Sequence, residues 1–242
     1  MMMTSLQEGC LPVTQKTAIV TSLLKKASLD PHDLKNYRPV SNLSFVSKLV
    51  KRVAVKQLTD YLESHHLMPL LQSAYRRHHS TETALLKVLS DVLTAADDKK
   101  VTLLALLYLS AAFDCIDHDI LLSTLQSRFG LYGIVLAWIR SFLSDRVQRV
   151  CFSDCLSAVL LCVIYGVPQG SVLGALLFLL YTAEVFAIIE AIQLTGHSYA
   201  DDTQVYISVP VGETQHASAR LAECVQHLDR WMAHSRLKLN AD

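Results

Sequence analysis

Hydrophobic positions recur at helical spacing in some segments of this chain and in strand-like patterns in others. Apolar residues between Leu43 and Leu62 return every three or four positions, which predicts a long amphipathic helix. A second helix is predicted after Ser80, a suitable N-cap, with Glu82 favourably placed in its first turn. Residues 101–107 form a continuous apolar run of strand length, which is typical of a strand covered on both faces.

The second half of the chain continues this mixed pattern. A helix is predicted to open near Asp117 and to stop at Gly130, and a shorter one to cover residues 136–143. Residues 147–152 alternate as a strand does, and a last helix is predicted over residues 217–231. Helices interspersed with strands indicate an α/β (α+β) fold class.

The longest apolar run covers residues 172–192 and approaches the length of a membrane span. It contains Glu184 and Glu190, and Gly170-Ser171 before it is typical of the entry to a buried helix, so no membrane partner is expected. The N-terminus has no basic segment followed by an apolar run, and no secretory signal is predicted.

Two neighbouring carboxylates stand where the pattern predicts the tip of a β-hairpin. Asp201 and Asp202 lie between the short apolar run 194–198 and the strand-like segment 203–208. Negative charge held rigidly at such a tip suits divalent cations and a nucleoside triphosphate. Taken alone, an Asp-Asp pair between strands is more often a polar turn. The rest of the chain decides between the two interpretations.

Composition agrees with a globular intracellular protein that has a basic and an acidic part. The 242 residues are 51% apolar, enough for one large domain or two small ones, and the six cysteines include no Cys-x-x-Cys pair, which favours reduced core residues. Residues 1–100 carry 14 Lys and Arg against 9 Asp and Glu, whereas residues 101–242 carry 8 against 13. This asymmetry fits a nucleic-acid-binding part joined to a metal-binding part, although uneven solvated faces would produce it as well.

Five further motifs accompany the Tyr199-Ala200-Asp201-Asp202 turn. They are Asn-Tyr-Arg-Pro-Val-Ser at 36–41, Gln-Ser-Ala-Tyr-Arg-Arg-His-His-Ser-Thr at 72–81, Leu-Ser-Ala-Ala-Phe-Asp at 109–114, Gly-Val-Pro-Gln-Gly-Ser-Val-Leu-Gly at 166–174 and Arg-Leu-Lys-Leu-Asn-Ala-Asp at 236–242. In this order the chain closely resembles the reverse transcriptases of non-LTR (LINE-type) retrotransposons over nearly its whole length. Any one motif would be weak support, but the ordered set is specific.

The resemblance implies a right-hand polymerase fold. Residues 1–100 would form the fingers region and residues 101–242 the palm region, with a helical excursion at about 120–150, as one reverse transcriptase domain. The family's thumb would follow residue 242 and is expected to be missing, as is the endonuclease domain that commonly precedes this region. The implied activity is RNA-directed DNA synthesis in the nucleus, with an RNA template, a DNA primer and deoxynucleoside triphosphates.

The resemblance also assigns roles to single residues. Asp201 and Asp202 would bind two Mg²⁺ ions, with the backbone carbonyl of Leu109 as a further ligand. Phe113 stands where the family keeps a bulky gate against the ribose 2′-hydroxyl, although by itself it would be taken for a core aromatic.

Further residues match the substrate-binding positions of the family. Gln169 and Gly170 would lie against the incoming base pair, and Lys25 and Arg38 would meet the triphosphate. Without the resemblance, Lys25 would be an ordinary solvated charge. A separate group is expected to face the template backbone: Arg76, Arg77 and His78.

One position departs from the family pattern. The family has Asp-Leu before Ser-Ala-Ala-Phe-Asp, and that Asp is its third metal-binding carboxylate; Tyr108 stands there in this chain. A neutral phenol is a poor Mg²⁺ ligand, and Asp114 lies too far along the chain to replace it. A folded palm with impaired catalysis is therefore predicted. The alternatives are a non-catalytic nucleic-acid-binding remnant and a chain that does not fold.

Overall fold

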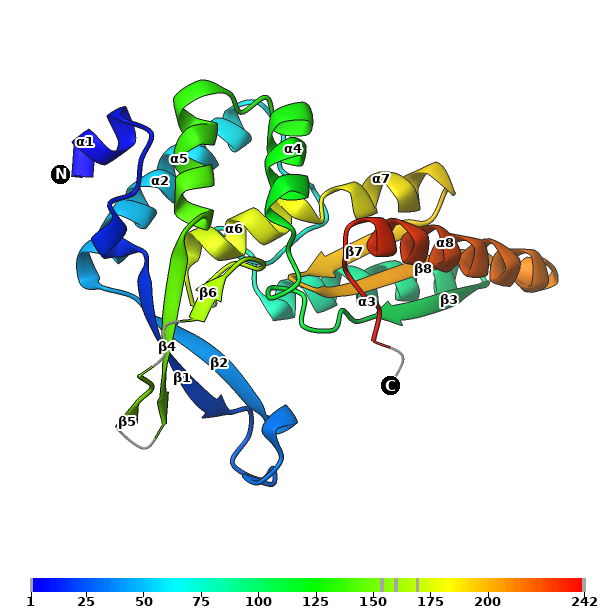
Figure 1. Cartoon of the computed structure of the whole chain (residues 1–242). Helices are drawn as coiled ribbons and strands as arrows, with labels where there is room; N and C mark the ends of the chain where they lie inside the picture. The colour runs from blue at the N-terminus through cyan, green and yellow to red at the C-terminus, as the bar shows by residue number, and fades with distance from the viewer. Residues whose placement is uncertain (1, 153–154, 159–160, 169, 241–242) are drawn as a thin grey trace. The chain divides into compact units, whose positions relative to one another are not determined.

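The computed structural model describes residues 2–152, 155–158, 161–168 and 170–240 (Figure 1). The chain forms two compact units, each built from two separate stretches. The first unit comprises Met1–Leu67 and Ile116–Phe178, and the second comprises Met68–Cys115 and Leu179–Asp242. The assignment of residues 1–100 to fingers and 101–242 to palm stays a prediction, since the two units do not follow that division.

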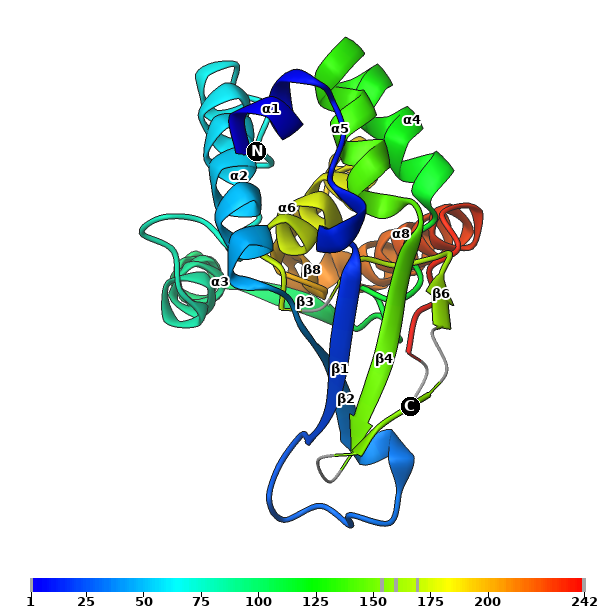
Figure 2. The ribbon, with the colours of Figure 1, turned by 60° about the vertical axis from the view of Figure 1, so that its left-hand side comes forward.

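The first unit combines a mixed sheet with a group of helices. Its strands are β1 (Thr17–Leu24), β2 (Tyr37–Asn42), β4 (Arg146–Phe152), β5 (Cys155–Leu156) and β6 (Leu161–Val163). The sheet order is β2-β1-β4-β5, with β6 also on β4; β1 pairs antiparallel with β2 and parallel with β4. Figure 2 shows the long strands β1 and β4 side by side. The helices are α1 (Met2–Gln7), α2 (Phe45–Ser64), α4 (His118–Phe129), α5 (Gly133–Leu143) and the start of α6 (Val172–Tyr181).

The second unit is a three-stranded antiparallel sheet between helices. Its elements are α3 (Thr81–Asp97), β3 (Lys100–Leu107), α7 (Glu184–Ala191), β7 (Thr195–Tyr199), β8 (Asp202–Pro210) and α8 (Thr214–His234), with the strand order β3-β8-β7. Tyr206 donates a hydrogen bond to Asp91 of α3 (2.6 Å), so α3 covers that face. Val205, which points the other way, is fully buried, because α8 packs on the opposite face.

The predicted helix boundaries are confirmed where capping residues set them. The Ser80 hydroxyl accepts a hydrogen bond from the backbone N–H of Thr83, and the Thr83 hydroxyl accepts one from the backbone N–H of Ser80, which forms a capping box at the start of α3. The Asp117 carboxylate caps α4 by accepting from the backbone N–H groups of Asp119 and Ile120, and Gly130 ends that helix in the left-handed conformation (φ 63°).

Two predictions from the apolar pattern are wrong. Residues 101–107 do form a strand, but β3 lies at the sheet edge, and Leu104 and Leu106 are 46% and 53% exposed. Residues 172–192 form two helices, α6 and α7, with a break at Thr182, whose hydroxyl donates to the carbonyl of Leu179 (3.5 Å) and so competes with the helical bonding.

The apolar stretch Val172–Ala191 is long and apolar enough to cross a membrane by length and composition alone. In this fold 67% of its 18-residue apolar window is buried. The prediction for the cysteines holds for Cys224, which is buried, but Cys10 and Cys155 are exposed.

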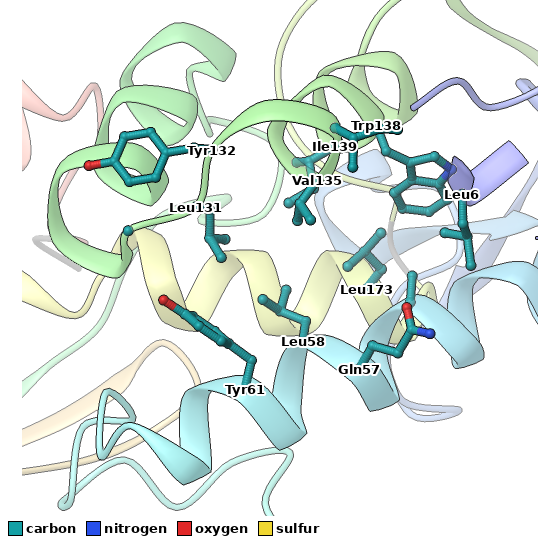
Figure 3. A pocket seen from close by; sticks show the side chains of 13 residues that line it. Leu6, Gln57, Leu58, Tyr61, Leu131, Tyr132, Val135, Trp138, Ile139 and Leu173 are labelled. Atoms are coloured by element: carbon teal, nitrogen blue, oxygen red, sulfur yellow. The ribbon is translucent and has the colours of Figure 1, made fainter. Parts of the chain in front are cut away.

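An apolar cavity of about 520 Å³ lies in the first unit (Figure 3). Tyr61 and Leu58 of α2 line one side, Trp138 and Val135 of α5 line the other, and Leu173 of α6 lies between them. The indole of Trp138 donates to the Ser5 hydroxyl (3.1 Å). Of the residues that the structure describes, no charged side chain lines this cavity, so its chemistry differs from that of the carboxylate turn.

Candidate active site

The acidic turn lies between β7 and β8 in the second unit. Tyr199 pairs with Asp202, so the connection is the two-residue loop Ala200-Asp201, and Ala200 is left-handed (φ 57°). Such short loops hold the flanking strands in a fixed register. Asp202 is exposed and Asp201 is half-buried, so both carboxylates are accessible at the end of the hairpin.

The two carboxylates disfavour each other's charge. Partial burial, and next to it the negative charge of Asp201, raises the pKa of Asp202 above its ordinary value. A bound cation would remove this repulsion. The electrostatics of the turn therefore favour a positively charged ligand.

Tyr108 lies across the sheet from this turn. The β3–β8 register pairs Leu107 with Thr203, and the next step along both strands sets Tyr108 opposite Asp202. Its side chain is 48% exposed. That Tyr108 occupies the place of a third acidic ligand stays a prediction.

The segment after Tyr108 is held by the C-terminal residues. The backbone N–H of Asn240 donates to the Tyr108 carbonyl (2.7 Å), and that of Ser110 donates to the Lys238 carbonyl (2.9 Å), which forms a bridge between Leu109 and Leu239. The acceptors of these two hydrogen bonds are the carbonyl oxygens of Tyr108 and Lys238, so the Leu109 carbonyl takes part in neither of them.

Asp201 and the end of β3 line one small hollow in the second unit. Leu107 at the end of β3 and Leu109 just after it line one part, and Asp201 and Thr203 of the hairpin line another. The predicted neighbourhood of the 108–113 segment and the acidic turn is thus present. Phe113 is half-buried within the same unit.

The acidic side chains of the turn itself are two carboxylates. Among the described residues, no group of three or more His, Cys, Asp or Glu side chains is placed to hold a metal ion. Asp201 and Asp202 supply two carboxylates, and the residue expected at the position of a third is Tyr108. A clamp that needs a third carboxylate between two ions is therefore not matched by these side chains.

The loop from Gln72 to Ser80 lies against the hairpin. Gln72 forms a parallel bridge with Ser198, and the backbone N–H of Ser73 donates to the Ser198 carbonyl (2.9 Å). Partial burial, and with it the charge of Asp201, raises the pKa of Tyr75 in this loop, so Tyr75 belongs to the surroundings of the acidic turn.

The three basic residues predicted to face the template differ in their contacts. One guanidinium nitrogen of Arg76 donates to the carbonyls of Pro69, Leu70 and Gln72, at 2.9, 3.2 and 3.2 Å. Arg77 and His78 are exposed. Arg76 therefore shapes the loop, whereas the other two side chains face solvent.

The predicted triphosphate-binding residues belong to the first unit. Arg38 lies on β2 opposite Leu23 of β1, and Lys25 follows two residues after Leu23, which is the spacing of one strand face. Both side chains are exposed.

Gly170 lies in the same unit. It has φ 85°, and a Cβ there would stand 3.7 Å from Val40 Cγ1 and 3.8 Å from the Ser41 carbonyl. The positive φ, rather than lack of space, accounts for glycine. Gln169 lies outside the described residues.

Several residues around the turn were not predicted. Gln72, Ser73 and Tyr75 belong to the motif at residues 72–81, but nothing in the local sequence pattern predicts that they lie beside the hairpin. His197 and His79 both hydrogen-bond to the Ser73 hydroxyl, at 3.3 and 3.0 Å. Only the folded chain brings these residues together.

The fold of the chain is that of a right-hand polymerase. The chain belongs to the reverse transcriptase (RNA-dependent DNA polymerase) family, whose model matches residues 24–242. This confirms the family expected from the motifs. The family uses divalent metal ions and binds a nucleic-acid template.

Individual relatives agree with this family. The chain is 31% identical to a probable RNA-directed DNA polymerase from transposon BS of Drosophila melanogaster, over 85% of this chain and 23% of the relative. It is 27% identical to the RNA-directed DNA polymerase from mobile element jockey of the same species, over 98% of this chain and 26% of the relative. The chain thus spans about a quarter of the length of these relatives.

Solved structures confirm the polymerase fold. Apo telomerase from Candida tropicalis matches with a TM-score of 0.65 and 12% identity, over 93% of this chain and 43% of the telomerase. A telomerase from Candida albicans, in complex with a fragment of telomeric RNA, matches with a TM-score of 0.59 and 11% identity, over 96% and 42%. The expected α/β right-hand polymerase fold is confirmed.

Proposed function

We propose that this chain is the fingers and palm of an RNA-directed DNA polymerase of a non-LTR retrotransposon, and that its catalysis is impaired. The observation that carries the proposal is the β3–β8 register, which sets the Tyr108 position opposite the Asp201-Asp202 turn. The relatives support polymerase activity for the longer proteins. For this chain the activity depends on what the turn can bind.

Asp201 and Asp202 would hold Mg²⁺, with the Leu109 carbonyl as a further oxygen. Oxygen donors of this kind suit Mg²⁺, which when bound supplies positive charge to a triphosphate and to an attacking 3′-hydroxyl. The rigid turn keeps the two carboxylates at the end of the hairpin, and their mutual repulsion favours a cation between them.

Tyr108 would leave this site incomplete. Loss of one carboxylate from such a clamp costs several kcal/mol in the transition state, which corresponds to roughly a thousandfold or more in rate. The phenol does not disturb the fold, because it is half-exposed at the end of an edge strand.

The substrates would be an RNA template, a DNA primer and deoxynucleoside triphosphates. Arg77 and His78, exposed on their loop, would meet template phosphates, with Arg76 holding the loop. Lys25 and Arg38 would meet the triphosphate. The base pair would be bordered by Gln169 and Gly170, with Phe113 as the gate against the 2′-hydroxyl. Priming on chromosomal DNA implies a nuclear location.

A second function is favoured by the same observation. With Tyr108 in place of a carboxylate, a protein that binds nucleic acid without copying it would keep the basic residues and lose the chemistry. Both functions predict binding of primer and template. They differ in what happens when the carboxylate is restored.

Primer extension on an RNA template with Mg²⁺ or Mn²⁺ separates them. We expect no extension by the wild-type chain, extension by Tyr108→Asp, and none by the control Tyr108→Asn, which is polar but uncharged. Robust extension by the wild-type chain would reject the proposed impairment. A Tyr108→Asp protein that binds primer and template but never extends would favour the binding function.

A further inference from the structure

Gln72 is a buried polar side chain next to the acidic turn. It is 1% exposed, and it lies where the loop 72–80 meets β7, through the parallel bridge to Ser198. Glutamine is seldom buried unless its amide group is satisfied. The partners of this amide are therefore informative.

The side chain of Gln72 binds both backbone groups of Ala200. Its Oε1 accepts hydrogen bonds from the N–H of Ala200 and the N–H of Ala74, both at 3.0 Å. Its Nε2 donates to the Ala200 carbonyl (3.2 Å). The side-chain amide of Gln72 thus hydrogen-bonds to both backbone groups of a residue that lies 128 positions away in the chain.

Ala200 needs such support. Its φ of 57° is left-handed, and a residue with a Cβ atom adopts this conformation at an energetic cost that its surroundings must offset. Asp201 is the next residue, so the conformation of Ala200 sets the direction in which the turn presents both carboxylates. A different turn conformation would point them elsewhere.

A second set of contacts fixes the same loop to the same strand. The Ser73 hydroxyl is hydrogen-bonded to His197 of β7 (3.3 Å) and to His79 of its own loop (3.0 Å). Burial, followed by the charges of Lys87 and His79, lowers the pKa of His197, so this ring is neutral at pH 7. The loop is therefore anchored beside the hairpin independently of Gln72.

We infer that Gln72 is a positioning residue: it holds Ala200 left-handed and so aims Asp201 and Asp202 at their cation. The inference rests on the proposed function for the identity of the ligand. It assigns Gln72 no contact with substrate. Because Gln72 begins the loop that carries Arg77 and His78, it also joins the template-facing loop to the acidic turn.

The test combines amide exchange with metal binding. Gln72→Met keeps the size of the side chain and removes both the acceptor and the donor. Gln72→Glu keeps the acceptor for the Ala200 N–H. Gln226→Met, at an exposed position of α8 in the same unit, is the matched control. Hydrogen exchange of the Ala200 amide is measured by NMR without metal, and Mn²⁺ affinity is measured by electron paramagnetic resonance.

We expect Gln72→Met to exchange the Ala200 amide at least about tenfold faster than wild type, and to bind Mn²⁺ about tenfold more weakly, as loss of a buried bond implies. Gln72→Glu should keep the amide protected, and Gln226→Met should match wild type in both measurements. If Gln72→Met does not fold, the exchange rate of the Ala200 amide in Gln72→Glu tests the inference. Rapid exchange of this amide in Gln72→Glu would overturn it.

Unchanged Ala200 exchange in folded Gln72→Met would overturn the inference. Faster exchange with unchanged Mn²⁺ affinity would also overturn it, because the bond would then be structural only. If the wild-type chain binds no Mn²⁺ at the turn, the proposed function is wrong. The exchange rates of the Ala200 amide then still test whether Gln72 fixes the conformation of Ala200.

Discussion

Tyr108 stands opposite Asp202 across the β3–β8 ladder, one step beyond the paired residues Leu107 and Thr203. This places a phenol beside an acidic turn whose two carboxylates repel each other. The backbone of the Tyr108 position is fixed by the bond from the Asn240 N–H (2.7 Å). A carboxylate introduced at position 108 would therefore stand beside the turn on a backbone that is already in place.

The charge repulsion in the turn predicts how Asp202 affects stability. The folded-state pKa of Asp202 is raised, so the folded chain loses stability as pH rises through the range above the ordinary pKa of an aspartate. At pH 7 without metal, Asp202→Asn should unfold at the same Tm as wild type or higher. Added Mn²⁺ should raise the Tm of wild type but not that of Asp202→Asn. A calorimetric scan in which Mn²⁺ stabilises both proteins equally would place the bound ion elsewhere.

The buried Lys51 of the first unit is expected to make the stability of the fold depend on pH in a second way. Its side chain is 1% exposed, and its Nζ has no hydrogen-bond partner among the described residues. Nζ lies 5.2 Å from the centre of the Phe142 ring, and the Arg146 guanidinium carbon lies 5.1 Å from the same ring. Burial, then the charges of Arg146 and Lys48, lowers the pKa of Lys51 to about 7.

Because the unfolded chain keeps Lys51 protonated up to its ordinary pKa of 10.5, stability should rise with pH between about 7 and 10.5. Lys51→Met should raise the free energy of unfolding at pH 7 by about 1–4 kcal/mol and flatten this rise. Lys26→Met, at an exposed position of the same unit, is the control and should change little. Urea titrations at several pH values measure both effects. A destabilised Lys51→Met protein would contradict the assignment.

In the loop from Gln72 to Ser80, substitutions of the neighbouring residues Arg76 and Arg77 are expected to have different effects. Arg77→Gln should weaken binding of primer and template and lower the slope of log affinity against log salt concentration by about one. Arg76→Gln should instead lower the Tm, since it removes the donor to three carbonyls. Fluorescence anisotropy at several salt concentrations and a thermal scan separate the two effects. The reverse assignment of effects would show that Arg76 is the phosphate contact.

Local patterns in the sequence predicted the elements that local chemistry determines. Ser80 and Gly130 mark helix ends through bonds to nearby backbone, and the Asp201-Asp202 turn follows from strand-like segments on both sides. The edge position of β3 could not be predicted, because a continuous apolar run does not show how many neighbours a strand has.

The surroundings of the turn were not predictable for a related reason. Gln72 and Ala200 are 128 positions apart, and nothing in either segment indicates the other. The break at Thr182 depends on a single hydroxyl inside an apolar run. A local motif was therefore enough to predict where the two carboxylates lie. The side chains that contact their turn are brought there by the tertiary structure and could not be predicted.

The most direct test of the account is the Mn²⁺ affinity of the acidic turn with and without the missing carboxylate. Mn²⁺ is titrated into wild type, Tyr108→Asp and Tyr108→Asn in the presence of primer, template and a non-hydrolysable deoxynucleotide analogue. We expect Tyr108→Asp to bind at least about tenfold more tightly than wild type, a difference of about 1.4 kcal/mol, and Tyr108→Asn to resemble wild type. Equal affinity of wild type and Tyr108→Asp would contradict the claim that Tyr108 replaces a metal-binding carboxylate.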